Sequence, residues 1–292
     1  MRFHCGESMT AIDTYLPLAR AVEEMGFAGF VVPDSLIYPE ASDQEYLYTK
    51  DGGREFLENK PFIESFVLAT MILTATTRLE VTSNVIKLPV RPPLYSAKLA
   101  CSVAALSGDR FNLGVGLSVW PEDYVAMGVD FAKRGKRLDE CIEIVRGLSR
   151  GGYFAFHGEF YDLPAAKLNP VPSAPLPILI GGHADAALKR AAHNDGLMYA
   201  GGGPGQLAPL LDKIAAFRAE AGAGDRPFRI FATEIGAEGR ITMDTVRRME
   251  DLGVTDMPVV FRNVYAVEED RQPLQDKIDA HARFADEVIA RL

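Results

Sequence analysis

Cysteine is scarce in this chain of 292 residues, and the few that occur are far apart. Cys5, Cys101 and Cys141 form no C-x-x-C pair, which argues against a dithiol redox centre or a zinc site built on paired cysteines. An odd number of separated cysteines also lacks the pairing framework of small secreted domains. We therefore expect the protein to work in a reducing compartment, the cytoplasm.

Long apolar runs and an excess of positive charge are missing as well. The first ten residues, MRFHCGESMT, contain no apolar core of a signal peptide, and no uninterrupted run reaches the ~18 residues of a membrane span. The chain has 31 Lys and Arg against 40 Asp and Glu, a net charge of −9, whereas a nucleic-acid-binding face is basic. We expect a small-molecule substrate, and neither nucleic acid nor membrane as a partner.

Several catalytic signatures are absent too. There is no G-x-S-x-G, no P-loop lysine motif and no cysteine–histidine nucleophile signature. The five histidines show no spacing such as H-E-x-x-H, and no acidic residues cluster with them. The sequence therefore predicts no metal site and no covalent catalysis.

What the sequence does contain is a regular alternation of strands and helices. The stretch 78–120 has two strand-like runs, LEVTSNVIKL and RFNLGVGL, on either side of the amphipathic helix LYSAKLACSVAALS. Such a unit predicts two parallel strands joined by a right-handed crossover. Similar units continue along the chain, and about eight strands alternating with about eight helices are typical of a barrel. We predict an α/β fold, a (β/α)8 TIM barrel in which residues 1–292 form a single domain.

Two segments interrupt this alternation. Residues 36–60 are polar and too long for an ordinary βα loop, so they are predicted to form a lid-like loop. Residues 151–177 follow the fourth strand–helix unit and are predicted to be an insertion, with a hairpin where YFAFHGEFYDL alternates about His157-Gly158. A doubly wound sheet is the alternative fold, but Gly6-Glu7-Ser8 after the first strand does not supply the glycine-rich turn it needs.

Polar residues stand where the predicted strands end, which is the side where barrel enzymes bind ligands. Asp34 closes the second strand, Asn84-Val85 the third and Ser118 the fourth. Each is a candidate ligand contact, and each can equally be a satisfied turn residue. The stretch WPEDY from Trp120 follows the fourth strand and is a candidate wall for a planar ring, or a helix start packed on the rim.

A candidate phosphate site lies later in the chain. In ILIGGHADA a strand passes through Gly181-Gly182-His183 directly into a helix. Glycines let the backbone approach an anion, and the free N–H groups of the first helical turn point at it. The alternative is a tight βα turn without a ligand. Gly201-Gly202-Gly203, after the next strand, is a candidate for the opposite wall or a flexible loop.

These patterns together resemble a known family. The matching stretches are LSGDRFNLGVGLS, GVDFAKRGKRLDE, FHGEFYDL and PLPILIGGHADAALKRAA, within a resemblance that covers most of the chain up to about residue 200. They resemble the luciferase-like flavin monooxygenase superfamily, and within it the branch that uses the deazaflavin coenzyme F420. The resemblance implies a TIM barrel with an insertion, an oxidoreductase that transfers a hydride between an organic substrate and coenzyme F420, and a homodimer.

The resemblance also implies a cofactor site. A non-proline cis peptide at Asn84-Val85 would back the central ring, while Asp34 and Ser118 would contact the ring edge. The phosphate would bind at Gly181-Gly182-His183. The cofactor-binding residues predicted in this way are Asp34, Ser35, Ser83, Asn84, Val85, Ser118, Gly181, Gly182 and His183.

One departure from the family pattern leaves the proton chemistry open. Many members have a histidine directly after the acidic residue that closes the second strand, whereas here Ser35 follows Asp34. A hydroxyl cannot replace an imidazole as acid or base near neutral pH. The candidates for a catalytic residue are Asp34, Glu7 and His4, with proton exchange with water as a further option.

Several functions stay open on the sequence alone. The first is a coenzyme F420-dependent oxidoreductase, and the second an FMN-dependent monooxygenase on the same fold. The third, from another class, is a flavin- or deazaflavin-binding protein without turnover. A phosphate-handling isomerase or aldolase is a weaker fourth. Coenzyme F420 also has an anionic tail, for which Lys87, Arg91 and Lys98 are candidate contacts, although an exposed solvated face explains them equally well.

Overall fold

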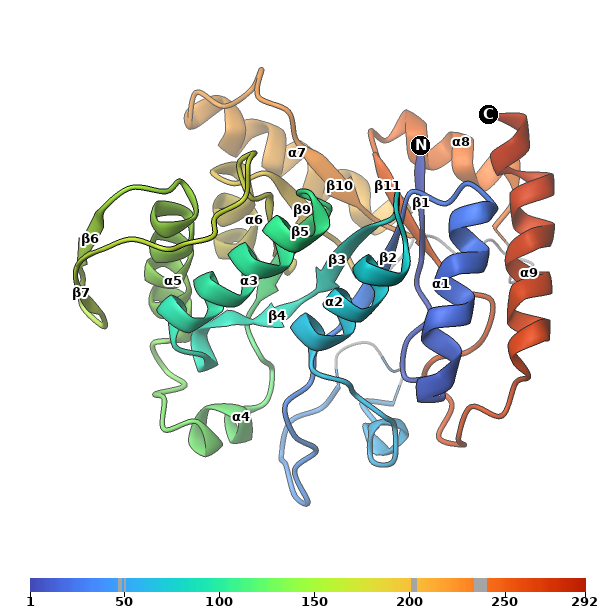
Figure 1. Cartoon of the computed structure of the whole chain (residues 1–292), viewed down its shortest axis with the longest axis horizontal. Coiled ribbons are helices and arrows are strands. Elements are labelled where there is room, and N and C mark those ends of the chain that lie inside the picture. Colours follow the sequence, from blue (N-terminus) through green and yellow to red (C-terminus); the bar gives the residue numbers. More distant parts are fainter. Residues whose placement is uncertain (47–48, 50, 201–203, 234–240) are drawn as a thin grey trace.

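The computed structural model describes residues 1–46, 49, 51–200, 204–233 and 241–292 (Figure 1). Its strands are β1 (Arg2–Cys5), β2 (Gly29–Pro33), β3 (Glu80–Asn84), β4 (Ile86–Lys87), β5 (Phe111–Gly116), β6 (Phe154–His157), β7 (Asp162–Ala166), β8 (Ile178–Gly181), β9 (Gly196–Met198), β10 (Arg229–Phe231) and β11 (Asp256–Val259). Its α-helices are α1 (Tyr15–Glu24), α2 (Ser65–Ala75), α3 (Pro93–Ser107), α4 (Pro121–Ala126), α5 (Arg134–Ser149), α6 (Asp185–Ala192), α7 (Pro204–Glu220), α8 (Met243–Asp251) and α9 (Leu274–Glu287). Its 3₁₀ turns are η1 (Ile12–Thr14), η2 (Glu55–Leu57), η3 (Leu88–Val90) and η4 (Ile289–Arg291).

The strands of the main sheet close into a parallel barrel. Their spatial order is β1, β2, β3, β5, β8, β9, β10, β11, and the sheet closes because β11 pairs with β1. β4 continues the line of β3 along β5. Parallel neighbours need crossovers, and the helices make them on the outside of the barrel (Figure 1). The predicted (β/α)8 TIM barrel is therefore confirmed, and the doubly wound alternative is wrong.

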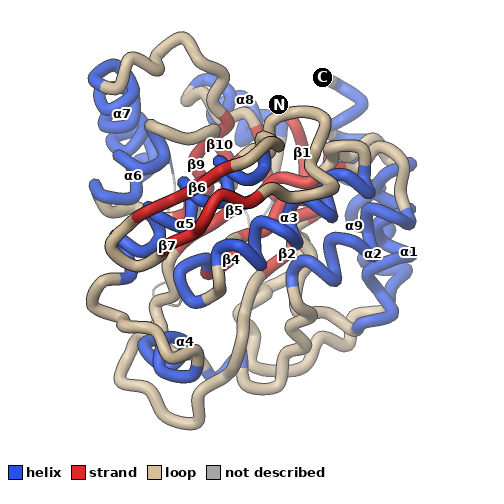
Figure 2. The backbone as a smooth tube through the Cα atoms, turned by 60° about the vertical axis from the view of Figure 1, so that its left-hand side comes forward, coloured by secondary structure: helices blue, strands red, loops and turns tan. Residues whose placement is uncertain are grey.

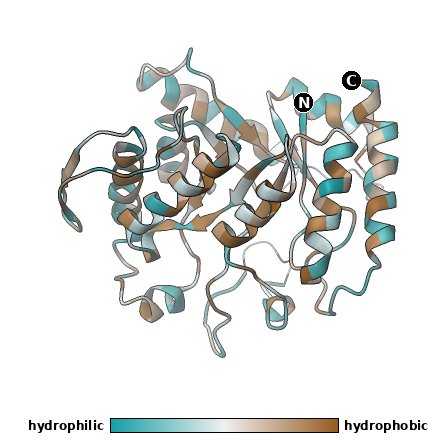
Figure 3. Cartoon of the chain, viewed as in Figure 1, coloured by the Kyte–Doolittle hydropathy of each residue, from teal (hydrophilic) through white to brown (hydrophobic). Residues whose placement is uncertain are grey.

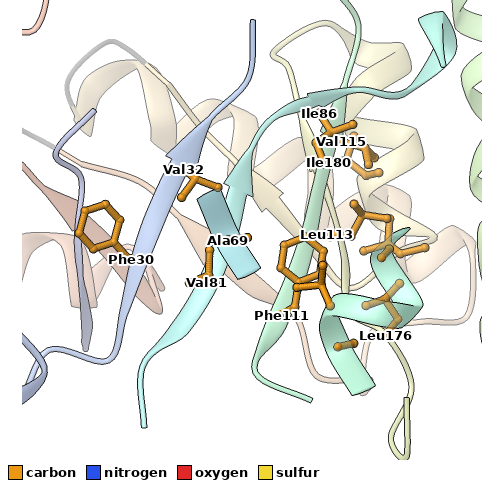
Figure 4. Packing of buried hydrophobic residues seen from close by; sticks show 14 of the residues in the cluster. Phe30, Val32, Ala69, Val81, Ile86, Phe111, Leu113, Val115, Leu176 and Ile180 are labelled. Carbon is orange, nitrogen blue, oxygen red and sulfur yellow. The ribbon is translucent and has the colours of Figure 1, made fainter. Parts of the chain in front are cut away.

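The main apolar core lies between the outside of the barrel and the helices. In β5, Phe111, Leu113 and Val115 are fully buried on the helix side, and Figure 4 shows Phe111 near Val81 and Ala69 and Val115 near Ile86 and Ile180. The helices turn apolar faces inward and polar faces outward, as α1 and α9 show most clearly (Figure 3). Within the described residues, no helix is both long and apolar enough to cross a bilayer.

The inside of the barrel has a charged end and an apolar end. The first residues of four strands form ion pairs at the amino-terminal end: Arg229 lies 2.5 Å from Asp256 and 3.1 Å from Glu80, and Arg2 lies 2.6 Å from Glu80. An apolar cluster of Leu179, Met198 and Phe231 follows toward the carboxyl-terminal end. The barrel is thus filled by side chains and closed at its base, so a ligand has access from the mouth alone.

The insertion forms an antiparallel hairpin of β6 and β7, as predicted (Figure 2). Its turn is held by one carboxylate: Glu140 of α5 accepts the backbone N–H groups of Glu159, Phe160 and Tyr161 at 2.6 to 3.3 Å. The hairpin begins after α5, which completes the fourth strand–helix unit, and it projects from the body of the molecule in Figure 1. Its position confirms the predicted place of the insertion.

Candidate functional site

Between β3 and β4, just below the mouth, the chain has one residue more than the part of β5 that it pairs with. Thr82 pairs with Asn112 and Ile86 with Val115, so the step from 82 to 86 opposes the shorter step from 112 to 115. The extra residue makes a β-bulge, a device that turns a side chain out of its regular direction. The peptide Asn84-Val85 inside the bulge is cis, as the resemblance implied.

The bulge places Val85 at the floor of the barrel mouth, where it packs on the interior apolar cluster. A Cβ added at Gly116 would lie 2.7 Å from Val85 Cγ2, and one added at Gly181 would lie 2.9 Å from Val85 Cγ1. Only glycine leaves room for the valine on both sides. The buried hydroxyl of Ser83 bonds both the N–H and the carbonyl of Gly114, each at 2.9 Å, and so fixes the bulge from behind. Ser83 has no exposed surface and positions the floor, while its direct contact with a cofactor stays a prediction.

Asp34 follows β2 at the mouth as predicted, but its carboxylate is already fully bonded. The Arg91 guanidinium donates to both oxygens, at 2.7 and 2.9 Å. The backbone N–H of Lys87 donates at 2.9 Å and the Ser65 hydroxyl at 3.0 Å. The Asp34 side chain is 1% exposed. Asp34 thus ties the end of β2 to the segment after β4, and its geometry leaves no role as a general base. Ser35, next in the chain, remains accessible.

Ser118 belongs to a buried polar triad beside the mouth. The Lys87 ammonium lies 2.8 Å from Asp123 Oδ2, and the Ser118 hydroxyl donates to the same oxygen. The backbone N–H of Trp120 donates to Ser118 Oγ at 3.0 Å. The triad therefore fixes the course of the chain from β5 into α4 and sets the place of Trp120.

The two ion pairs correct one interpretation of the sequence. Lys87 and Arg91 were candidate contacts for an anionic cofactor tail, but they are paired with the buried carboxylates of Asp123 and Asp34. Lys98 donates to the carbonyl of Asn169, beyond the hairpin. Lys87 and Arg91 are thus part of the wall of the mouth.

Glu7 anchors the segment that follows β11. Its carboxylate lies 2.8 Å from Arg262 Nε and 3.6 Å from the Lys277 ammonium, and it is 1% exposed. Asp270 completes the group, 2.7 Å from Lys277 and 3.4 Å from Arg262. The Glu7 carboxylate is buried between two cations and joins the segment after β1 to the segment after β11. This geometry does not support Glu7 as a proton donor to a substrate.

His4 lies inside the barrel, below the mouth. Its Nε2 lies 2.7 Å from Asp256 Oδ1, and its ring packs against Phe231 at a centroid distance of 5.0 Å. Burial lowers the pKa of His4 below its ordinary value, so the ring is neutral near pH 7. Because His4 is 0% exposed and the apolar cluster lies over it, it is not placed to exchange a proton with a substrate.

The predicted phosphate site has the expected backbone. Gly182 has a φ of +130°, and α6 begins at Asp185 without a side-chain cap. The His183 ring packs on Tyr199 at 4.7 Å, and burial lowers the pKa of His183. Asp185 adds a negative charge to the first turn, and Lys213 pairs with it at 2.7 Å. This turn fits a phosphate through its backbone. Gly201-Gly202-Gly203, the predicted opposite wall, lies outside the described residues.

Aromatic side chains from three distant segments meet above the mouth. Tyr46 stacks on Trp120 at 6.1 Å, with 17° between the rings, and meets Phe56 edge-on at 5.1 Å. Tyr265, from the segment after β11, packs against Phe56 at 5.2 Å. Tyr46 and Phe56 both belong to the segment 36–60. No local pattern in the sequence pointed to Tyr265, because Tyr46 and Phe56, on which its ring packs, lie more than 200 positions away.

A cavity of about 230 Å³ lies beside Trp120 of this aromatic group. It is lined by residues 35–39, 57, 58, 60 and 62 together with Trp120. Ser35 is one of its lining residues, so the cavity begins directly beside the end of β2. In the part of the chain that the structure describes, no three His, Cys, Asp or Glu side chains gather as metal ligands.

Comparison with known proteins agrees with this geometry. Residues 3–237 match the model of the luciferase-like monooxygenase family. The chain is 54% identical over its full length to the uncharacterized protein Rv0940c of Mycobacterium tuberculosis, also over that protein's full length. It is 28% identical over 199 residues to the pyrimidine monooxygenase RutA of Acinetobacter baylyi, covering 64% of this chain and 53% of RutA.

The barrel also matches a solved structure. The coenzyme F420-dependent tetrahydromethanopterin reductase from Methanopyrus kandleri superposes with a TM-score of 0.73 over 99% of both chains, at 14% identity. Such a low identity indicates a shared fold. The match of the family model over most of the chain, together with the barrel and its mouth, places the chain in the luciferase-like monooxygenase family, a family of oxidoreductases.

Proposed function

We propose that this oxidoreductase binds coenzyme F420 at the barrel mouth and transfers a hydride between the coenzyme and an organic substrate. The observation that carries the proposal is the Val85 floor, which packs on the interior apolar cluster and is flanked by Gly116 and Gly181. This surface is apolar, and it suits a planar ring system. The shared barrel of the F420-dependent reductase from Methanopyrus kandleri supports the choice of coenzyme.

The residues present fit such a cofactor in defined roles. Val85 would support the ring, and the backbone N–H groups of Gly182 and His183 would hold a phosphate at the start of α6. The coenzyme, when bound, supplies a carrier for two electrons and a proton as hydride. The buried pairs Asp34–Arg91 and Lys87–Asp123 keep the wall of the mouth rigid.

The chain's own contribution to the chemistry is then mainly orientation. Trp120, on which Tyr46 stacks, forms one wall of the cavity beside the mouth. The carboxylates of Asp34 and Glu7 and the imidazole of His4 are held in buried bonds. We therefore propose that the substrate exchanges its proton with water that enters past Ser35.

An FMN-dependent monooxygenase is the second candidate. The likeness to RutA, a monooxygenase, supports it. The ion pairs of Lys87 and Arg91 also support it, because they engage two of the cations that the longer anionic tail of F420 would use. The phosphate turn at Gly182 serves FMN equally well.

Titration of the apo-protein with each cofactor separates the candidates. We expect saturable binding of coenzyme F420 and at least about tenfold weaker binding of FMN, a difference of about 1.4 kcal/mol. The variant Val85→Trp should abolish binding of either cofactor, whereas the exposed Val267→Trp should leave it unchanged. Tight binding of FMN alone overturns the F420 proposal. Bound F420 that no hydride donor reduces above background would indicate a binding protein without turnover.

A further inference from the structure

The cavity beside the mouth is small, and polar and apolar groups share its walls. Its volume of about 230 Å³ equals roughly eight water molecules at about 30 Å³ each. Its apolar lining residues are Leu36, Ile37, Pro39, Leu57, Phe62 and Trp120. This space suits a molecule with a single ring and a short substituent, smaller than the ligands of most binding pockets.

The Trp120 indole is held in place before any ligand arrives. Its backbone is fixed by Ser118, and Tyr46 stacks on it. The Arg54 guanidinium lies 5.8 Å from the Trp120 ring and 4.8 Å from that of Tyr38, and is anchored on the carbonyls of Pro39 and Glu40. Such a preformed wall binds a ring without the entropy loss of ordering the side chain.

Lys60 gives the cavity one charged contact. Its half-buried side chain lines the cavity, and its ammonium donates to the backbone carbonyl of Glu268. An ammonium has three donors, so two remain. No carboxylate oxygen of the described residues lies within 4.0 Å of it. Glu58 also lines the cavity, but its side chain is exposed, where water and salt screen its charge.

We propose that this cavity is the substrate pocket and that it takes a small carboxylic acid with a single apolar ring. The carboxylate pairs with Lys60, and the ring lies against Trp120. A half-buried cation that has no carboxylate partner among the described residues binds a carboxylate through charge-assisted hydrogen bonds, which a neutral molecule of the same shape lacks. The identification of the bound acid as the substrate rests on the proposed function. The binding of the acid to Lys60 is independent of that function.

The chain offers a direct reporter, because Trp120 is its single tryptophan. Tryptophan fluorescence of the apo-protein is followed during titration with cyclohexanecarboxylate and, separately, with the neutral cyclohexylmethanol. Both probes are transparent where tryptophan absorbs. We expect a saturable change in fluorescence with the carboxylate and at least about tenfold weaker binding of the alcohol. A difference of this size is what the loss of a charged hydrogen bond costs in affinity.

Three variants test the role of Lys60. Lys60→Gln should weaken carboxylate binding about tenfold and leave the alcohol unchanged, while Lys60→Arg should retain the preference for the acid. Lys98→Gln is the matched control, since Lys98 likewise donates to a backbone carbonyl, that of Asn169, and does not line the cavity. It should leave both probes unaffected.

The proposal is overturned if both probes bind equally, if Lys60→Gln binds the acid as the parent does, or if neither probe changes the fluorescence. Cofactor titrations on the same samples, without the probes, separate it from the proposed function. Acid binding through Lys60 without affinity for F420 or FMN keeps the pocket and removes the oxidoreductase proposal. Cofactor binding without acid binding keeps the oxidoreductase proposal and removes the pocket proposal.

Discussion

The two ends of the barrel both bury ion pairs, but they build them differently. At the amino-terminal end, Arg229 joins Glu80 and Asp256, and each of the three is the first residue of a strand. At the mouth, Asp34 pairs with Arg91, a residue that lies outside the strands. Strand residues are fixed by the sheet itself, whereas residues outside the strands are fixed largely by their partners.

The two ends of the barrel therefore have different roles. The charges at the base depend on barrel closure and in turn stabilise it. The charges at the mouth set the shape of a surface that receives ligands. In barrels of this class the carboxyl-terminal face carries the chemistry and the opposite face carries stability. Substitutions at the base should therefore change the free energy of unfolding alone, and substitutions at the mouth should also change ligand affinity.

Removal of Asp256 should give the largest effect. Asp256→Ala leaves His4 buried without its carboxylate and Arg229 with Glu80 alone, and breaking a buried pair in this way costs about 3–5 kcal/mol. Urea unfolding measures the loss. Cofactor affinity of the folded protein should not change, and a fall in affinity without a fall in stability would contradict the division between the two ends.

At the mouth, Gly116→Ala should cost about 1–3 kcal/mol, because its Cβ would overlap Val85. Cofactor affinity should fall as well, since the floor must shift. The double variant with Val85→Ala should recover part of the stability, giving a coupling energy in a double-mutant cycle. Strictly additive effects would show that Val85 is not what excludes a side chain at this position.

Acid should destabilise the fold through two buried histidines, His4 inside the barrel and His281 on α9. Burial lowers the pKa of His4 and of His281, so below the unfolded value of about 6.5 the unfolded chain takes up protons that the native state does not. Stability therefore falls as the pH drops below that value, by at most about 1.4 kcal/mol per pH unit for each histidine. The Arg229 and His4 partners also hold the pKa of Asp256 well below its usual range, against the effect of its burial, which adds a further loss below about pH 4.

Denaturant unfolding between pH 7.5 and 5.5 measures this slope. The variant His4→Asn should show a smaller slope than the parent. The exposed His157→Asn serves as the control and should keep the parent slope. Equal slopes in all three proteins would remove His4 from the explanation.

An exposed pair outside the barrel should give the smallest effect. His157 and Asp162 lie across the hairpin, and both side chains are more than three-quarters exposed. Asp162→Ala should change the free energy of unfolding by less than about 1 kcal/mol, because water screens such pairs. A loss as large as that of Asp256→Ala would mean that exposure does not separate the two kinds of pair.

The fold could be read from the sequence because its signals are local. Runs such as residues 27–32 and 110–117 are long enough to predict strands, and the ends of the second, third and fourth predicted strands pointed to Asp34, Val85 and Ser118. Barrel closure then brings those ends to one mouth, as predicted.

The hydrogen-bond and ion-pair partners of the site residues could not be predicted from the sequence. Arg91 lies 57 positions from Asp34, and Arg262 lies 255 positions from Glu7. Such pairs depend on the exact approach of loops and helices after closure, which no local pattern encodes. The sequence therefore predicted where polar residues gather, and it did not predict that their hydrogen-bonding capacity is already filled.

The hairpin of the insertion has a consequence for how such chains diversify. It is attached mainly to α5, through the Glu140 carboxylate and through Phe154, whose ring occupies the place where a Cβ of Gly147 would be. The pairing of β5 with β8, which carries the barrel past this point, involves none of these residues. A longer, shorter or foreign hairpin can thus be grafted here while the barrel keeps its closure, which makes this position a natural entry point for new modules.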